Sequence, residues 1–409
     1  MNKVKAMAIL IMALILHFSG LNCMAEEQSE EPAVPSLDNL TISLITCYPG
    51  PEIYELCGHS AIRVRGIGEK GQRVDSVWNY GIFDFNQPNF VYRFVKGETD
   101  YKGAAYPFAW FMPEYIRGGR EVVEQDLNLT PEEKKDLLAL LRNSVKPENA
   151  TYRYNYIKDN CSTRIVNQID SASSVEIIFP LEGKYGTYRN TMRAYHKGYP
   201  WYQFGIDVAL GSGLDEKTGA REEMFVPVEL MEYAGNAHFS DGRPLVSSTR
   251  ILNRGKGDVT LPPTPWFLSP LFWSWLVALA LAATVAWNIF KFRLYLPVYG
   301  AWFFILGLAG CLVAFLVFIS VHESTSPNLL IFWLNPMQFL FTLSVGIRKL
   351  RLLALAMAWY NILACGVLLI VSPWFTQSFN AAFYPLLLAT FGLAGAYAII
   401  APKSSYKRR

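Results

Sequence analysis

The chain has 409 residues, of which 37 are Lys or Arg and 34 are Asp or Glu, so its formal net charge is only +3. It has no run of basic residues of the kind that follows a phosphate backbone, which excludes nucleic acid as an expected partner. Hydrophobic residues make up 52% of the chain. They are concentrated after Trp266, which indicates a soluble-like part followed by a membrane-embedded part.

The first 25 residues have the features of a secretion signal. Two lysines precede an apolar run at 6–18, and small residues lead up to Ala25. This order is typical of a cleaved signal peptide, so we expect residues 1–25 to be removed after Ala25 and the next part to be exported. Lipidation of Cys23 is the alternative processing. Residues 26–38 are acidic and contain proline, which predicts a flexible leader without chemistry of its own.

Residues 39–262 mix strand and helix patterns and predict an exported α+β domain. The alternation at 76–80 and at 152–156 indicates strands or strand ends. Thr130 and Glu133 form a capping-box pattern with proline at the first helical position. A helix from there through Ser144 belongs to the scaffold of the domain.

Cys161 is the candidate nucleophile. Cys161, Ile165 and Ile169 recur every four residues and therefore share one face of a predicted helix, with Asp159 or Asn160 as its N-cap. A thiol in the first turn of a helix lies near the positive end of the helix dipole, which stabilises the thiolate. This placement is typical of cysteine hydrolases and acyltransferases.

His59 is the expected partner of Cys161. The alternating residues after it predict a strand, and a strand histidine that faces a helix-N-terminal cysteine is the papain-like arrangement. Asn79 is the first candidate to orient the imidazole, with Asp84 and Asp75 as alternatives.

The other cysteines leave some alternatives open. Cys57 is a rival nucleophile because it lies two residues before His59. A disulfide between Cys47 and Cys57 is a further alternative in an exported domain. Cys311 and Cys365 fall within apolar segments and are expected only to pack.

The five histidines show no repeated spacing with Cys or Asp, so the sequence has no metal signature. His196 and His238 are expected to be surface or hydrogen-bonded residues. Thiol-based acyl chemistry needs no cofactor, and we expect none.

The C-terminal part contains apolar segments close to the roughly 20 residues that a bilayer requires. They are 266–290, 294–320, 329–345, 352–371 and 381–400. The third is the weakest because Asn335 and Pro336 lie within it. These segments predict an all-α bundle of about five transmembrane helices over 263–402.

Basic residues determine the expected orientation of this bundle. Lys and Arg cluster at 291–293, 348–351 and 403–409, whereas the connections at 322–328 and 372–380 have none. The positive-inside rule therefore predicts a cytoplasmic C-terminal tail at 403–409, and places the loop with His322 and Glu323 on the exported side.

Three motifs resemble the Lnb N-terminal periplasmic domain family. They are GHSAIRV at 58–64, NYGIFDF at 79–85 and DNCSTR at 159–164. WYQFGIDVALG at 201–211, EMFVP at 223–227 and the stretch from His322 to Pro336 are similar to the same family, so the resemblance covers nearly the whole chain.

The resemblance implies a bacterial lipoprotein N-acyltransferase of the inner membrane, with a permuted papain-like (NlpC-type) periplasmic domain. In that family the histidine precedes the cysteine, which matches His59 and Cys161 as general base and nucleophile. It implies a phospholipid as acyl donor and a diacylated lipoprotein as acceptor.

Two further residues are weaker predictions. Arg164 and His322 are candidate substrate-binding residues, although His322 lacks the proline that we expect directly after it. Two other functions use the same sequence features. One is a membrane-anchored cysteine peptidase or peptidoglycan amidase, and the other is a non-catalytic envelope assembly or binding protein.

Overall fold

The structure is a computed structural model that describes residues 39–67, 72–84, 88–374 and 376–403. The predicted signal and leader, with Cys23, lie outside the described residues, as does the tail beyond Lys403. Of the described residues, 41–65 and those from 75 to 403 belong to one compact unit, and 39–40, 66–67 and 72–74 belong to another. The site and the helical bundle described below both belong to the first of these units.

A seven-stranded sheet forms the centre of the N-terminal part. Its strand order is β6-β4-β3-β2-β1-β5-β9. The strands are β1 (Leu40–Cys47), β2 (His59–Ile67), β3 (Arg73–Ile82), β4 (Asp100–Pro107), β5 (Val122–Leu127), β6 (Thr151–Arg153) and β9 (Val246–Asn253). The pairs β1–β5, β3–β4, β4–β6 and β5–β9 are antiparallel. His59 begins β2 and Asn79 lies on the adjacent β3, so neighbouring strands carry both residues.

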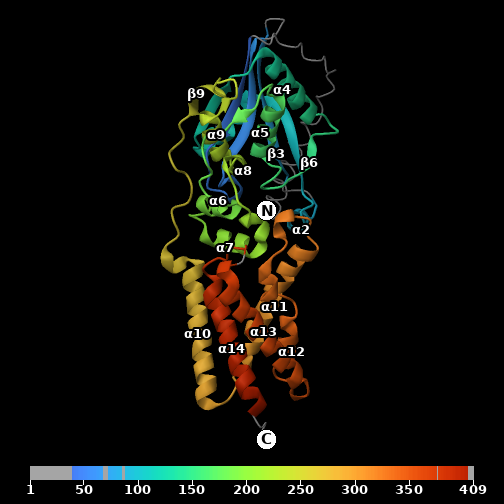
Figure 1. Ribbon diagram of the computed structural model, residues 1–409, viewed down its shortest axis with the longest axis vertical. Coiled ribbons are helices and arrows are strands. Elements are labelled where there is room, and N and C mark those ends of the chain that lie inside the picture. Colours follow the sequence, from blue (N-terminus) through green and yellow to red (C-terminus); the bar gives the residue numbers. More distant parts are fainter. Residues whose placement is uncertain (1–38, 68–71, 85–87, 375, 404–409) are drawn as a thin grey trace, which may run out of the picture. The chain divides into compact units, whose positions relative to one another are not determined.

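The helices of the N-terminal part lie beside this sheet or, as α6 (Tyr188–Tyr195) and α7 (Pro200–Ala209) do, between it and the C-terminal bundle (Figure 1). The others are α2 (Phe90–Lys96), α3 (Phe108–Gly118), α4 (Pro131–Ser144), α5 (Cys161–Ala172), α8 (Ala220–Glu223) and α9 (Pro227–Asn236). The short strands β7 (Ile177–Ile178) and β8 (His238–Phe239) pair separately. The mixed α/β architecture predicted for this part is therefore present (Figure 1).

The predicted helices at 131–144 and 161–172 form as expected. Thr130 accepts a hydrogen bond from the Glu133 amide, and the Glu133 carboxylate accepts one from the Thr130 amide, so the capping box is present. In α5, Ile165 and Ile169 are buried on the same face as Cys161. The two helices pack against each other, and the start of α5 contacts the sheet through a hydrogen bond between the hydroxyls of Ser162 and Ser60 (3.0 Å).

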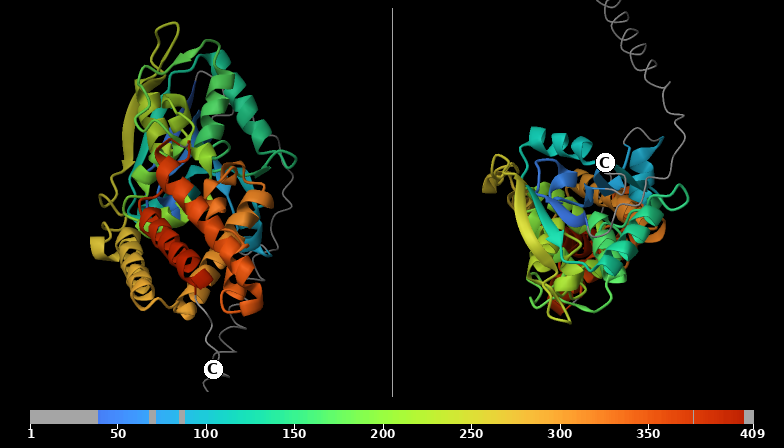
Figure 2. Two further views of the ribbon diagram at one scale, coloured as in Figure 1. Left: turned by 60° about the horizontal axis from the view of Figure 1, so that its bottom comes forward. Right: turned by 90° about the horizontal axis from the view of Figure 1, so that it is seen from above.

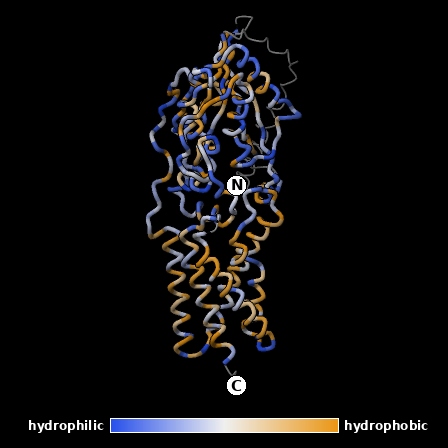
Figure 3. Tube along the Cα trace, viewed as in Figure 1, coloured by the Kyte–Doolittle hydropathy of each residue, from blue (hydrophilic) through white to orange (hydrophobic). Residues whose placement is uncertain are grey.

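The C-terminal part is a bundle of α10 (Pro270–Lys291), α11 (Leu296–Phe318), α12 (Gln338–Ser344), α13 (Arg351–Val371) and α14 (Phe383–Lys403). Among the described residues, four of these helices are long and apolar enough to cross a membrane, and only α12 is too short. α14 packs against both α10 and α13, as the further views in Figure 2 show. Apolar residues cover these helices along their length (Figure 3).

Of the apolar segments predicted as about five transmembrane helices, the third, already the weakest, does not form one continuous helix. Residues 329–345 form a 3-10 turn, η6 (Leu329–Phe332), and the short α12 instead of one helix. Pro336 has no amide hydrogen to continue a helix. The Asn335 side chain donates to the carbonyl of Ile331, and the Gln338 side chain donates to that of Trp333, so side chains satisfy groups that a helix would have paired.

The broken third segment nevertheless runs between opposite ends of the bundle. At one end, the amide of Leu329 donates to Gln377, in the connection that follows α13. At the other, Thr342 of α12 lies 3.5 Å from the carbonyl of Gly300, in the first turns of α11. The chain therefore crosses the bundle here as two short helical pieces.

Candidate active site

The start of α5 is fixed by Asn160, its N-cap residue. The Asn160 Oδ1 atom accepts hydrogen bonds from the amides of Ser162 (2.9 Å) and Thr163 (3.0 Å). Its Nδ2 atom donates to the carbonyls of Tyr156 (2.7 Å) and Phe225 (2.8 Å). Asn160 thus satisfies two unpaired amides of the helix start and ties them to two other segments. Cys161, the first residue of α5, is held in one position as a result.

Three predicted residues meet at this point. The Nε2 atom of His59 lies 2.5 Å from Oδ1 of Asn79, and the imidazole also hydrogen-bonds to the Cys161 thiol. Since Asn79 occupies Nε2, the Nδ1 atom remains for the thiol. The Nδ2 atom of Asn79 in turn donates to the hydroxyl of Tyr106 at 2.8 Å. The structure therefore brings Cys161, His59 and Asn79 together in one hydrogen-bonded row.

The electrostatics of the row favour a thiolate. Burial alone would raise the pKa of Cys161, but the charge and hydrogen bond of His59 and a hydrogen bond from the Ser60 backbone outweigh it and lower the pKa. Burial likewise opposes charge on His59, but the Cys161 thiolate and the hydrogen bond to Asn79 raise the pKa of the imidazole above 6.5. The two groups stabilise each other as an ion pair, which makes the sulfur nucleophilic.

Comparisons with known proteins give two matches, and both are to one family. The Lnb N-terminal periplasmic domain matches residues 33–194, and the Lnb transmembrane domain matches residues 263–404. The chain belongs to the Lnb family. It is accordingly a membrane protein with a periplasmic domain, related to lipoprotein biogenesis. No curated protein and no solved structure matches it.

The alternative orienting residues lie elsewhere in this Lnb-family chain. Asp75 forms a bidentate ion pair with the guanidinium of Arg63, and both nitrogen–oxygen distances are 2.7 Å. Asp84 is exposed beyond the end of β3. Asn79 is therefore the one of the three that contacts His59, because the pleat of β3 and its register with β4 direct it to the row.

Cys57 and Cys47 are both free thiols, so the structure contradicts the alternative of a disulfide between them. Burial raises the pKa of Cys57 to about 12, although its thiol lies 3.0 Å from the Tyr156 hydroxyl. Burial raises the pKa of Cys47 even further. Burial thus disfavours the thiolate of both residues, in contrast to Cys161, whose pKa is lowered.

The two predicted substrate-binding residues have intramolecular partners. The guanidinium of Arg164 makes two hydrogen bonds to Asp159 (2.6 and 2.8 Å) and lies 3.4 Å from the ring centre of Tyr152. His322 donates from Nε2 to the carbonyl of Phe94 at 2.8 Å. Contact of either residue with substrate stays a prediction.

Two further histidines lie among the described residues, outside the row of Cys161, His59 and Asn79. His196 is buried and hydrogen-bonded to Gln203 at 2.8 Å, and burial lowers its pKa. His238 lies in the short strand β8, half-buried. Within the described part of the chain, no group of three His, Cys, Asp or Glu side chains is placed to hold a metal ion.

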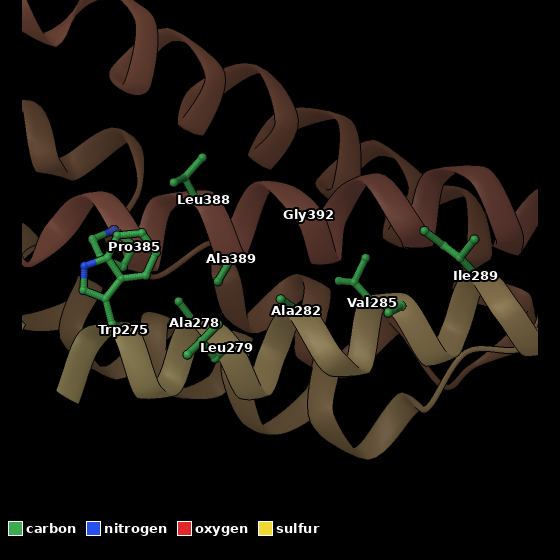
Figure 4. A pocket seen from close by; sticks show the side chains of 11 residues that line it. Trp275, Ala278, Leu279, Ala282, Val285, Ile289, Pro385, Leu388, Ala389 and Gly392 are labelled. Carbon is green, nitrogen blue, oxygen red and sulfur yellow. The ribbon is translucent and has the colours of Figure 1, made fainter. Parts of the chain in front are cut away.

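Two cavities lie among the described residues, and none of Cys161, His59 and Asn79 lines either of them. One, of about 340 Å³, lies beside Lys158 in the segment before α5 and is also lined by Asp215 and by Glu323 of a bundle loop. The other, of about 380 Å³, is an apolar groove between α10 and α14 that Trp275, Ala282 and Gly392 line (Figure 4). Both are formed by residues that sequence patterns alone do not bring together.

Sequence reasoning missed Tyr106 and the Ser60 backbone as members of the site. Tyr106 reaches Asn79 only because Val77 pairs with Tyr106 across β3 and β4. For Ser60, the sequence offered one signal, namely that it directly follows a candidate catalytic histidine.

Proposed function

We propose that this Lnb-family chain is a lipoprotein N-acyltransferase with a papain-like catalytic domain. It moves an acyl chain from a phospholipid to the α-amine of an N-terminal diacylglyceryl-cysteine. The observation that carries this proposal is the row of Cys161, His59 and Asn79 at the N-terminus of α5, in a chain that also contains a transmembrane domain. A thiolate–imidazolium pair supports acyl transfer through a thioester.

In the first half-reaction, the Cys161 thiolate attacks the ester carbonyl carbon of the phospholipid. The carbon–oxygen bond of the ester breaks as the carbon–sulfur bond forms, and protonated His59 gives its proton to the leaving alcohol oxygen. The products are lysophospholipid and an acyl thioester on Cys161, with His59 now neutral. Asn79 keeps the imidazole oriented during this transfer.

In the second half-reaction, the free amine of the diacylated lipoprotein attacks the thioester carbonyl. Neutral His59 accepts the amine proton, the carbon–sulfur bond breaks, and the amide of a triacylated lipoprotein forms. The departing thiolate restores the ion pair with His59. Both substrates have chains embedded in a membrane, and a catalytic domain attached to a bundle meets them without extracting them.

The first test uses alkyne-tagged phospholipid and the purified full-length protein. We expect an acyl adduct that neutral hydroxylamine releases, and its loss in Cys161→Ala and in His59→Ala but not in Cys57→Ala. On addition of a diacylated lipopeptide, the label should move to its amine. Label that passes only to water would favour the peptidase or amidase alternative, and an unlabelled wild type would favour the non-catalytic one.

We also propose that the chain lies in the inner membrane with its C-terminus in the cytoplasm. This orientation is supported by Lys291, Arg348 and Lys403, which lie at the ends of the bundle helices away from the loops that contact α2 and α7. A fluorescent protein fused after Arg409 should fluoresce, and alkaline phosphatase fused there should be inactive. Active alkaline phosphatase at that position would reverse the proposed orientation.

A further inference from the structure

The short helix α2 is attached to the end of α11 by its own last carbonyl groups. Ser320 donates to the carbonyl of Val95 (3.0 Å), the amide of Val321 donates to that of Lys96 (2.8 Å), and His322 donates to that of Phe94 (2.8 Å). The carbonyls at the C-terminus of a helix lack partners within the helix. Here the segment that directly follows α11 supplies those partners, so α2 is fixed relative to the end of a membrane-spanning helix.

The outer face of α2 is apolar and exposed. Val91 is 74% exposed, Tyr92 is 55% exposed and Phe94 is 50% exposed. The ring of Tyr92 contacts the ring of Phe315 in α11, with 6.1 Å between centroids. Phe315 lies three residues before the end of α11, which is about 4.5 Å inside that end at 1.5 Å per residue. This face is therefore continuous with the apolar surface of a helix that spans the membrane.

A series of aromatic rings leads from α2 to the nucleophile. Phe94 stacks on Phe90 (6.0 Å), Phe90 on Phe83 (6.3 Å), and Phe83 contacts Tyr101 (5.2 Å). Tyr101 in turn stacks on Tyr154 at 4.2 Å.

Tyr154 brings this aromatic series to Cys161. Gly81, which has a positive φ of 85°, lies between them: a methyl group added to it would meet the Tyr154 ring at 3.5 Å and Cβ of Cys161 at 4.0 Å. The ring series thus leads from the exposed face of α2 to Tyr154, which only Gly81 separates from Cys161. The hydrogen-bonded row of the active site does not use it.

We propose that the α2 face of Val91, Tyr92 and Phe94 inserts into the lipid leaflet beside α11, and that the aromatic series guides a lipid acyl chain from there to Cys161. The second half of this inference rests on the proposed function. Lipid is the expected occupant because the face continues the membrane-contacting surface of α11, and because aromatic side chains are favoured at membrane–water interfaces. His322 then acts as a positioning residue that holds α2 at this depth.

Insertion of α2 can be tested without catalysis. Full-length Cys161→Ala protein is reconstituted into vesicles of phosphatidylethanolamine and phosphatidylglycerol (3:1) that contain a phospholipid with a diazirine in its acyl chain. After illumination, we expect mass spectrometry to find adducts at residues 90–94 and at Phe83. No adducts are expected at Ile251, a residue on β9 that is 48% exposed. Adducts confined to the bundle helices would overturn the proposal.

The guiding role is tested in the catalytically intact protein. Phe90→Ala and Phe94→Ser should lower thioester formation from vesicle phospholipid at least ten-fold, whereas reaction of Cys161 with water-soluble p-nitrophenyl acetate stays within two-fold of wild type. Ile251→Ser is the matched control and should change neither rate. Unchanged labelling from vesicles, or an equal loss with both substrates, would contradict the guiding role.

The two experiments also distinguish a failure of this inference from a failure of the proposed function. If wild type forms no thioester from phospholipid, the proposed acyl transfer fails, while adducts on α2 in the Cys161→Ala protein still support its insertion into lipid. If wild type forms the thioester but α2 gives no adducts, the acyltransferase proposal stands and the inserted α2 face is excluded.

Discussion

Each member of the Cys161–His59 pair depends on the other for its charge. The pKa of the thiol is lowered mainly because the imidazole offsets the effect of burial, and the pKa of the imidazole is raised mainly because the thiolate does the same. The lowered pKa of Cys161 and the raised pKa of His59 both favour the thiolate–imidazolium form. Acylation should be bell-shaped with pH, since protonation of the thiolate limits it at low pH and deprotonation of His59 limits it at high pH.

Asn79→Ala tests this dependence. The hydrogen bond from His59 to Asn79 raises the pKa of the imidazole, so its loss should lower that pKa and move the alkaline limb of the acylation profile to lower pH. We also expect a loss of rate of about 10- to 100-fold, because the imidazole loses its fixed orientation. Tyr106→Phe is the control, since Asn79 retains its contact with His59. A rate loss without movement of the alkaline limb would indicate only a structural role for Asn79.

At the scale of elements, sequence patterns predicted those helices and strands that are marked by regular apolar spacing or by capping residues. The helix at Cys161 and the helix after Thr130 were found because apolar spacing and capping residues mark both, and the strand of His59 was found from alternation. The break at Asn335 was noticed, but its outcome depends on side-chain hydrogen bonds and on close packing against α11. Local sequence does not reveal such partners.

Helix α6 contains a buried residue that local sequence patterns do not predict. Arg189 in this helix is completely buried, held by Asp207 and Asp215 at 2.8 and 2.9 Å. A buried arginine contradicts the expectation that charged residues mark the exposed face of a helix. Only the tertiary positions of its two partners explain it, and the same is true of the contact between Tyr106 and Asn79.

The packing of the broken third segment can be tested at a glycine of α11. A methyl group on Gly310 would lie 2.3–2.4 Å from backbone atoms of Asn335, which cannot move away as a flexible side chain can. Gly310→Ala should therefore lower the melting temperature of the detergent-solubilised protein, despite the gain of about 1 kcal/mol that alanine brings to a helix. Gly300→Ala, in the same helix with nothing within 4 Å, should not lower it. Equal melting temperatures for both variants would contradict this packing.

At the scale of the whole molecule, a buried carboxylate joins the catalytic part to the bundle. Asp207 of α7 accepts hydrogen bonds from Arg189 (2.8 Å) and Arg193 (3.2 Å), and also from Asn380, which lies just before α14 (2.8 Å). Arg193 reaches the same bundle connection through Ser378 at 2.9 Å. Asn328, in another bundle loop, donates to the carbonyl of Val208 at 2.9 Å. Polar contacts from α6 and α7 thus help to fix the N-terminal part relative to the bundle.

Asp207→Ala should uncouple the two parts. It leaves the buried Arg189 with one carboxylate fewer and removes the acceptor of Asn380, and breaking a buried ion pair costs about 3–5 kcal/mol. We expect a lower melting temperature and weaker thioester formation from vesicles. Asp170→Ala removes an exposed pair with Arg221 and should cost less than about 1 kcal/mol. If the two variants have the same melting temperature, Asp207 does not couple the N-terminal part to the bundle.

The distance along the chain between His59 and Cys161 has a consequence for the protein before it folds. The imidazole that lowers the thiol pKa lies on β2, and the thiol lies on α5, so the pair exists only after the sheet and the helix have packed. In a newly made chain, Cys161 is an ordinary thiol with an ordinary pKa near 8.5. The sulfur of an unfolded chain is therefore unactivated, and its nucleophilic form arises only when β2 and α5 have come together.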